Sequence, residues 1–311
     1  MPSPTSDTPT ILTGPLRAPR QMLAEQSYAG HTSVHDAETA ANLGLAGAPI
    51  EGPTHFSQFD PLLVDRWGER WFSHGCLSAH FQTMVVEGEQ VRATVTHDDK
   101  AADRVTVDAV KADGTPVLTG SASVGPDHLE TALAPRLARA VADPPTDLYV
   151  IDVLSVGMKG PGEETVTVTF DEDFGELYPF TLTQKLGKIT EPSPWYLANA
   201  ETPWGGPVVP IEMLSVLTNS ASKHSSFAAR QPSIGLFIDL EVQLLGEPVL
   251  VGHTYRIDRE IVAMGASRRT ESYWTRTLLT DVANPDGVPA AEVLLHQGVF
   301  KDSYPGYPTD T

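Results

Sequence analysis

The chain has 311 residues, and its 41% hydrophobic content suffices for a packed core in each of two domains of ordinary size. Its 40 acidic and 21 basic residues give a formal net charge of −19, so the average surface repels phosphate backbones and anionic membranes. We therefore expect neither nucleic acid nor a membrane as a partner. The single cysteine, Cys76, excludes an internal disulfide. Together with a start that lacks the pattern of a signal peptide, it favours a cytoplasmic location.

The first part of the chain predicts one helix, a Gly/Pro segment and a second helix. Residues 1–15 are expected to be a disordered lead-in, and residues 16–125 a first folded unit. Asp36 is a suitable N-cap for a helix over 37–43, which Gly44 would end. Residues 47–53 then lead into a mostly apolar helix over 54–67, which Pro61 is expected to kink or divide.

The rest of the first unit alternates as strands separated by turns, which is typical of an antiparallel meander. The expected strands cover residues 77–86, 90–97, 104–111 and 117–124. An Ala-, Pro- and Arg-rich stretch over residues 126–146, with a helix at 129–141, is expected to connect this unit to a second one.

The second unit is predicted over residues 147–301, and residues 149–156 are its first expected segment. Residues 302–311 are expected to form a tail. Its expected helix covers residues 211–227, after a proline-stiffened loop at 189–196. Its expected strands cover residues 164–170, 234–244, 254–263, 269–280 and 291–300.

The two units repeat the same landmarks in the same order, which indicates an internal duplication. The matching groups are Gly47, Pro49 and Ile50 with Gly205, Pro207 and Val208; Gly88 with Gly252; and Asp113-Gly114 with Asp286-Gly287. Each unit is then a helix followed by an antiparallel sheet, an α+β arrangement. The fold predicted from this pattern is a tandem (double) hotdog, with a central helix wrapped by a curved antiparallel sheet in each half.

The segments Ala29-Gly30, Val34-His35-Asp36, Ala40–Gly44 and Gly47–Gly52 resemble, in order, the active-site loop, following helix and Gly-x-Pro-Ile-x-His-Gly segment of MaoC-like proteins. This double-hotdog group includes (R)-specific enoyl-CoA hydratases and related dehydratases. The resemblance extends over residues 16–301 as architecture and implies a hydratase or dehydratase. In that group an Asp stands five residues before the catalytic His, whereas Gly30 stands five residues before His35 here, and Thr32-Ser33 replaces the Asn-Pro pair.

The catalytic candidates are His31, His35, Asp36 and Glu51. A histidine near neutral pH can exchange a proton with a carbon acid or a leaving hydroxyl, while a carboxylate fixes its tautomer. N-capping alone also explains Asp36, and Glu51 is equally suited to be a first-turn helix charge. His31 and His35 have the spacing of a zinc pair only in a helix, and no third ligand is spaced with them. We therefore expect no metal and no cofactor.

The substrate-binding candidates surround the two helix starts. Gly52 and His55 lie where free backbone N–H groups could bind an anion or an enolate-like oxygen, although a structural role for His55 is the alternative. Further candidates come from around the second helix, where aromatic side chains could form the floor of a pocket or pack as loop anchors: Trp195, Tyr196, Trp204 and Glu212.

Three functions are compatible with these residues. The favoured one is a lyase that hydrates or dehydrates an acyl thioester or related small carbonyl compound by His-centred acid/base catalysis. A hotdog thioesterase would need a carboxylate at the helix, such as Glu51, Asp60 or Glu212, and a catalytically silent binding protein would need only the pocket. A CoA thioester, a carrier-protein thioester and a free small molecule all stay open as the substrate, and homodimerisation of the chain stays open too.

Overall fold

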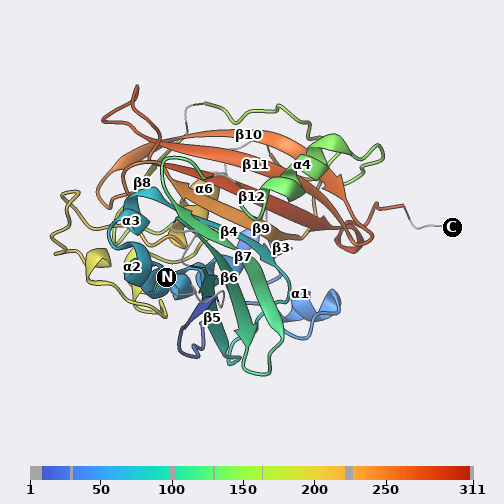
Figure 1. The fold of residues 1–311 in the computed structure, drawn as a ribbon. Helices are drawn as coiled ribbons and strands as arrows, with labels where there is room; N and C mark the ends of the chain where they lie inside the picture. The colour runs from blue at the N-terminus through green and yellow to red at the C-terminus, as the bar shows by residue number, and fades with distance from the viewer. Residues whose placement is uncertain are drawn as a thin grey trace, which may run out of the picture.

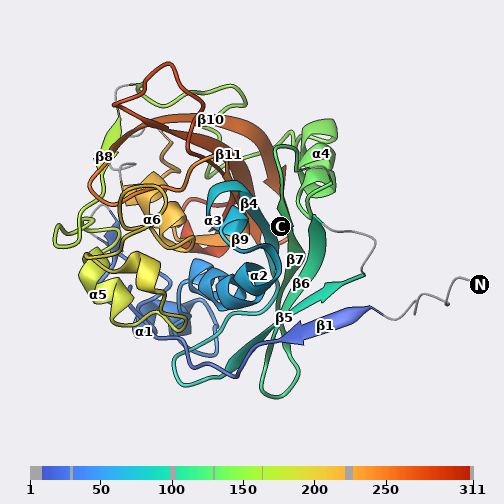
Figure 2. The ribbon, with the colours of Figure 1, turned by 60° about the vertical axis from the view of Figure 1, so that its left-hand side comes forward.

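The computed structural model describes residues 9–28, 31–98, 103–128, 130–162, 164–220 and 227–308. Within them, a ten-stranded antiparallel sheet curves around the central helices (Figures 1 and 2). In spatial order the strands are β1 (Thr10–Thr13), β5 (Val91–His97), β6 (Arg104–Lys111), β7 (Pro116–Val124), β4 (Gly75–Phe81), β9 (Gly235–Leu244), β12 (Ala291–Phe300), β11 (Thr270–Asp281), β10 (Thr254–Ala266) and β8 (Thr165–Thr167).

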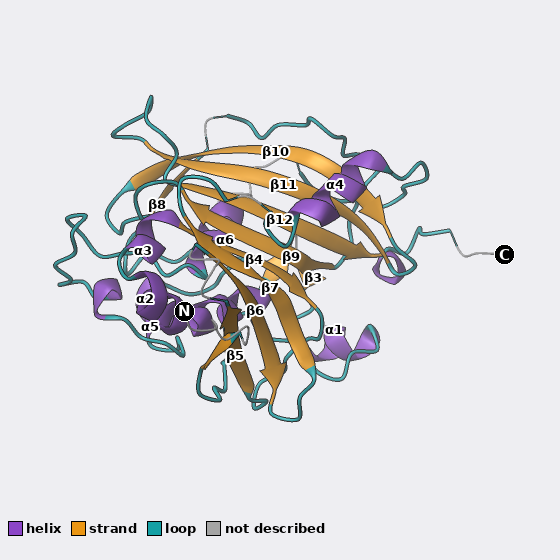
Figure 3. Cartoon of the chain, in the orientation of Figure 1, coloured by secondary structure: helices purple, strands orange, loops and turns teal. Residues whose placement is uncertain are grey.

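The helices are short, and they lie on both sides of the sheet (Figure 3). They are α1 (Ala37–Asn42), η1 (Gly52–Phe59), α2 (Asp60–Trp67), α3 (Arg70–His74), α4 (Ala134–Ala142), α5 (Leu182–Leu186), η2 (Pro194–Tyr196), α6 (Met213–Ser220) and η4 (Lys301–Ser303). The strands β2 (Ser27–Tyr28) and β3 (His31–Thr32) form a separate small hairpin. Figure 2 shows α2 and α6 on the concave side of the sheet, whereas α4 packs on its outer side against β10.

The two halves of the chain join through one antiparallel strand pair, β4 with β9. Its register runs from Cys76 opposite Gln243 to His80 opposite Asp239. We refer to the predicted units, residues 16–125 and 147–301, as the first and the second half. Because β4 comes from the first half and β9 from the second, the half-sheets meet edge to edge, and the predicted double hotdog fold is confirmed.

Proline shapes the central helix of the first half. The segment Gly52–Phe59 is a 3-10 helix with Pro53 in its first turn, and α2 starts again at Asp60 with Pro61 in its own first turn. Pro61 has no N–H and is tolerated at a helix start but not in its interior, so it divides the helix as the sequence predicted. One hydrophobic core fills the space under the sheet and includes Phe56 and Leu63 together with Leu214 of α6.

Some elements begin or end elsewhere than the sequence pattern predicts. Strand β1 lies inside the range 1–15, where a lead-in was expected, and pairs with β5. The polar stretch before Asp36 contains the antiparallel β2–β3 strand pair, which the sequence pattern does not indicate. Strand β4 ends at Phe81 instead of residue 86, and α4 begins at Ala134 instead of residue 129, with Pro135 in its first turn. Alternation alone does not show where the hydrogen-bonded partner of a strand ends.

The second half contains the larger differences. Residues 149–156, where the second half was expected to start, form turns that cover the sheet instead of joining it. Strand β8 is only Thr165–Thr167, at the edge of the sheet. The predicted helix over 211–227 is realised as α6, and residues 221–226 lie outside the described residues. No helix among the described residues is long and apolar enough to cross a membrane.

The shared core predicts that the two halves unfold together. Leu77 lies on β4 opposite Val242 of β9 and is 0% exposed. Leu77→Ala should remove about 2–5 kcal/mol from the free energy of unfolding, because the cavity left behind borders both halves. Urea denaturation followed by tryptophan fluorescence should then show one transition at a lower midpoint. Arg92→Ala, at an exposed position of β5, is the control. A transition that split into two, with only one shifted, would contradict a common core.

Candidate active site

One large cavity, of about 850 Å³, opens between the two halves of the molecule. The first half lines it with residues of the predicted site, namely His35, Glu51, Gly52 and His55. The second half contributes polar side chains from α6 and the long strands, among them Asn219, Arg259, Tyr273 and Gln297. The volume is that of a site for a small organic molecule. The structure therefore brings four of the sequence-predicted residues to one cavity.

His35 is held by its own loop in a defined tautomer. The Ser33 hydroxyl oxygen accepts a hydrogen bond from the backbone N–H of His35 at 3.1 Å. The His35 Nδ1 atom lies 2.7 Å from the carbonyl oxygen of Pro49, which can only accept, so Nδ1 carries the proton. Burial lowers the pKa of His35, although the Pro49 contact opposes the shift. At neutral pH the ring is therefore uncharged, and its Nε2 carries the lone pair of a base.

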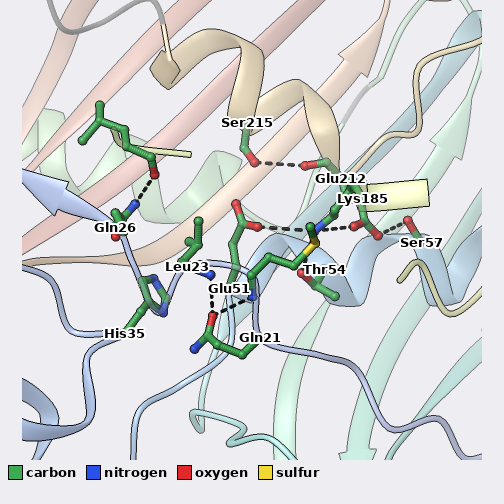
Figure 4. A network of polar contacts seen from close by, with 12 residues as sticks. Gln21, Leu23, Gln26, His35, Glu51, Thr54, Ser57, Lys185, Glu212 and Ser215 are labelled. Carbon is green, nitrogen blue, oxygen red and sulfur yellow. Dashed lines mark hydrogen bonds and ion pairs between the residues drawn. The ribbon is translucent and has the colours of Figure 1, made fainter. Parts of the chain in front are cut away.

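The carbonyl that orients His35 is itself fixed by a second donor. Gln21 Nε2 donates to the Pro49 oxygen at 2.6 Å. Figure 4 shows the other contact of the same amide, in which Gln21 Oε1 accepts from the backbone N–H of Leu23 at 2.8 Å. Gln21 thus ties the chain before the β2–β3 hairpin to the Gly/Pro segment. Two donors on one carbonyl oxygen restrict the rotation of the histidine ring.

Asp36 serves the helix and not the cavity. Its Oδ1 accepts a hydrogen bond from the Thr39 N–H at 2.8 Å, the geometry of an N-cap for α1, and this bond lowers the pKa of Asp36. The Nδ1 of the neighbouring His35 contacts Pro49 instead. His31 lies in β3 and not in a helix, and its side chain is outside the described part of the structure.

Glu51 is buried at the start of η1, with only 5% of its surface exposed. Its Oε2 atom lies 3.5 Å from Lys185 Nζ, whereas its Oε1 atom has no hydrogen-bond partner. Burial raises the pKa of Glu51, the Lys185 charge lowers it, and the nearby Glu212 carboxylate raises it again. The net result is a carboxyl group at the cavity that retains a proton more readily than an exposed one.

Lys185 of α5 connects Glu51 to Glu212, across the boundary between the halves (Figure 4). Its Nζ lies 2.7 Å from Glu212 Oε1, an ion pair by distance although the two atoms lack hydrogen-bond geometry. The same ammonium group donates to Thr54 Oγ1 at 3.2 Å, and the Ser57 hydroxyl donates to Glu212 Oε2. Burial alone would lower the pKa of Lys185, but Glu212 and Glu51 outweigh it and raise the pKa.

The start of η1 lines the cavity at Gly52. Gly52 is the first residue of the helix, Pro53 has no N–H, and the Thr54 N–H already donates to the Glu51 carbonyl. A side chain at Gly52 would come within 3.1 Å of the Phe81 ring, which explains the glycine. His55 is buried with no partner for Nδ1, and burial and the Lys185 charge lower its pKa to about 4. His55 is thus neutral.

The aromatic candidates of the second half pack away from the cavity. Trp195 contacts Phe72 and Trp204, with ring centroids 4.8 and 5.3 Å apart respectively, and none of the three lines the cavity. Tyr196 donates its hydroxyl to Asp60 Oδ2 at 2.7 Å. The Trp71 indole donates to Asp60 Oδ1 at 2.8 Å.

A small void of about 10 Å³ beside Asp60 is lined by Val208, Val209 and Ile211, residues next to the second Gly/Pro segment. Val208 is the duplicate of Ile50, which lines the large cavity. The duplicated position in the second half is therefore filled by side chains. No group of residues able to hold a metal ion occurs within the described parts of the chain.

Sequence reasoning missed the residues that support the site from a distance. Lys185 is not among the sequence-predicted site residues, yet it is a buried partner of two carboxylates. Gln21, Arg259 and Tyr273 carry no sequence signal of their own. The one signal for Lys185 is its place in a short helix with a Thr181–Gln184 capping box, where its neighbour Leu182 is also buried.

The comparisons with known proteins support the fold. No protein-family model matches the chain, and no curated protein matches it in sequence. A Mycobacterium tuberculosis protein with a double hotdog fold matches in structure with a TM-score of 0.54 and 11% identity, covering 92% of this chain and 96% of that one. A MaoC-like dehydratase matches with a TM-score of 0.50 and 15% identity, covering 93% and 97%.

Further structural matches have lower TM-scores. The dehydratase domain of PpsC from Mycobacterium tuberculosis, in complex with C12:1-CoA, has a TM-score of 0.46 and 11% identity, covering 94% of this chain and 95% of that one. Proteins described as thioesterases also match, with TM-scores of 0.41 and 0.43. The chain is thus similar to double-hotdog proteins, which include MaoC-like dehydratases.

The buried Asp60 predicts a pH dependence of stability. Burial raises its pKa to about 7 from an ordinary 3.8, so between these values the folded chain holds a proton that the unfolded chain releases. This group's contribution therefore falls as the pH rises from about 4 to about 7, by about 4 kcal/mol in total. Asp60→Asn should flatten the curve of unfolding free energy against pH over that window, measured by urea titrations. Parallel curves for the two proteins would contradict the assignment.

Proposed function

We propose that the protein is a lyase that hydrates or dehydrates the carbon–carbon double bond of a small acyl thioester, with His35 as base and Glu51 as proton donor. One observation carries the proposal: His35 Nδ1–H donates a hydrogen bond to the fixed Pro49 carbonyl oxygen, and His35 and Glu51 line the same cavity. A neutral base and a carboxyl group that retains its proton form an acid/base pair.

In the hydration direction, His35 Nε2 removes a proton from water as the water oxygen bonds to C3 of the enoyl group. The electron pair of the double bond moves to C2, which takes a proton from Glu51. The raised pKa of Glu51 suits it to hold that proton before the reaction. Afterwards His35 carries one proton more and Glu51 one fewer, and exchange with solvent restores both. Dehydration is the same sequence reversed.

Negative charge develops on the thioester oxygen as C3 is attacked, and the Gly52 N–H is the group that could stabilise it. It is the first N–H of η1 and lies at the positive end of that helix. The neutral His55 next to it adds no opposing charge. This role for Gly52 replaces the wider oxyanion site expected from the helix start, because Pro53 has no donor.

The fold supports the reaction class, and the cavity supports a small substrate. Both the MaoC-like dehydratase and this chain have the double hotdog architecture, and the dehydratase covers nearly the whole chain. The cavity of about 850 Å³ has room for an acyl group with its thioester.

The base is tested by His35→Asn, which keeps a donor for the Pro49 carbonyl but cannot accept a proton. The rate of hydration of a short 2-enoyl thioester, followed by loss of enoyl absorbance, should fall by ~10²–10⁴. His253→Asn is the matched control, since His253 pairs with Asp281 and does not line the cavity. Its rate should equal that of the parent. Equal melting temperatures would exclude misfolding.

The product identifies the reaction class in the same experiment. A 3-hydroxyacyl thioester is the product of hydration, whereas a free thiol, detected with a disulfide reagent, is the product of hydrolysis. Thiol release that depends on Glu51 and not on His35 would replace the lyase by a thioesterase, for which the unpaired Glu51 oxygen could position water. If the protein neither hydrates nor hydrolyses the thioester, a catalytically silent binding protein becomes the favoured function.

The net charge of −19 predicts a weak preference for the CoA nucleotide. Because the average field of the chain repels phosphates, an acyl-CoA and the matching N-acetylcysteamine thioester should have values of kcat/KM within about tenfold of each other. Adding 0.5 M NaCl, roughly enough to screen charges beyond a few ångströms, should change either value little. A CoA preference of several orders of magnitude that collapses in salt would show that phosphate contacts supply the binding energy.

A further inference from the structure

The carboxyl proposed as proton donor is supported by the other half of the chain. Glu51 belongs to the first half, whereas Lys185 and Glu212 belong to the second. All three side chains are buried, with 5%, 2% and 1% of their surfaces exposed. Two carboxyl groups share one ammonium group, so the protonation state of Glu51 depends on the charges of Lys185 and Glu212.

We propose that Lys185 is a positioning residue, which holds Glu51 Oε2 against the second half and so fixes the carboxyl group at the wall of the cavity, where Oε1 has no protein partner. Glu212 opposes the Lys185–Glu51 contact, because it attracts the same ammonium group from a shorter distance. The proposal rests on the proposed function, in which Glu51 donates the proton. It assigns a catalytic purpose to the three buried charged groups, whose desolvation opposes folding and is not needed merely to join the two halves.

Several contacts keep the Lys185 ammonium group in place. The α5 helix has a Thr181 N-cap with a capping box to Gln184, which fixes its first turn. The Lys185 Nζ lies 5.7 Å from the centroid of the Phe180 ring, and Thr54 Oγ1 accepts a hydrogen bond from it at 3.2 Å. The distances to the two carboxylates are unequal, 2.7 Å to Glu212 and 3.5 Å to Glu51. Glu51 is therefore only partly neutralised.

The groups that face Glu51 come from four elements. Lys185 approaches from α5 and Glu212 from the residue before α6, while His55 of η1 and His35 from before α1 line the same cavity. Both histidines have lowered pKa values and are neutral at pH 7. The charges that act on Glu51 above pH 7 are thus those of Lys185 and Glu212, which have opposite signs.

Because Lys185 and Glu212 carry opposite charges, removing each one should shift the pKa of Glu51 in opposite directions. A purely structural role would not give this pattern. The protonated Glu51 carboxyl should give an infrared carbonyl band, which is assigned by its absence in Glu51→Gln. The loss of this band as the pH rises reports the titration of Glu51 without any substrate. Lys185→Met should move the midpoint up by about one pH unit or more, because the attractive charge is gone. Glu212→Gln should move it down by a similar amount, because the repulsive charge is gone. Lys188→Met, an exposed lysine near α5, should leave it unchanged.

Lys185→Met alone could misfold, because it leaves two buried carboxyl groups without their cation. The double variant Lys185→Met/Glu212→Gln removes both charges together, and its midpoint should return toward that of the parent. Shifts in the same direction for the two single variants, or a double variant with no return, would overturn the proposal. Failure of His35→Asn to slow the reaction, with the opposite shifts still present, would overturn the proposed function but leave the charge coupling intact. Opposite shifts with no effect of Lys185→Met on hydration would remove its catalytic purpose.

Discussion

The pairing of β4 with β9 is the contact on which the rest of the structure depends. It joins two half-sheets into one surface and places the two central helices side by side under it. Only in that arrangement can Lys185 of the second half reach Glu51 of the first, and only there do both halves line one cavity. A single half would expose the strand edge and the apolar face that the other half covers, which is why hotdog units pair.

The duplication is preserved in the fold but not in the sites. In the first half, the Gly/Pro segment, the helix start and the His35 loop border open space. In the second half, the corresponding region is packed by Trp195, Tyr196 and the aromatic residues of α3. Packing aromatic rings into one pocket contributes burial energy and removes a second reaction centre. A duplicated chain can thus use one half for chemistry and the other for support.

The buried acidic groups give the interior an unusual electrostatic character. Glu51 and Glu212 share one lysine, whereas the hydrogen bonds to Asp60 within the described residues come from the neutral donors Trp71 and Tyr196. Burial in a medium that screens poorly disfavours ionised carboxylates, so the pKa values of Glu51 and Asp60 are both raised. The proposed reaction uses the proton of Glu51. The cost of burying such groups is offset by the large apolar core that surrounds them.

The fold was predictable because it is written in local patterns. Alternation in the strands, the Asp36 cap and the break at Pro61 all follow from neighbouring residues. The sequence also predicted His35, Glu51, Gly52 and His55, which the structure brings to one cavity. It could not predict the role of Lys185, because its partner Glu51 lies 134 residues away in the sequence. Nor could it distinguish the packing role of Trp195 from a ligand role, because both require the same apolar ring.

The central claim is that substrate chemistry takes place between His35 and Glu51 in the cavity that the two halves share. It is tested most directly by a crystal structure with a bound, unreactive 3-hydroxyacyl thioether analogue. The account predicts the 3-hydroxyl oxygen within hydrogen-bond distance of His35 Nε2, C2 facing the Glu51 carboxyl group, and the first N–H of η1, at Gly52, directed at the position of the thioester oxygen. An analogue bound elsewhere, or bound in this cavity with His35 turned away from it, would contradict the account.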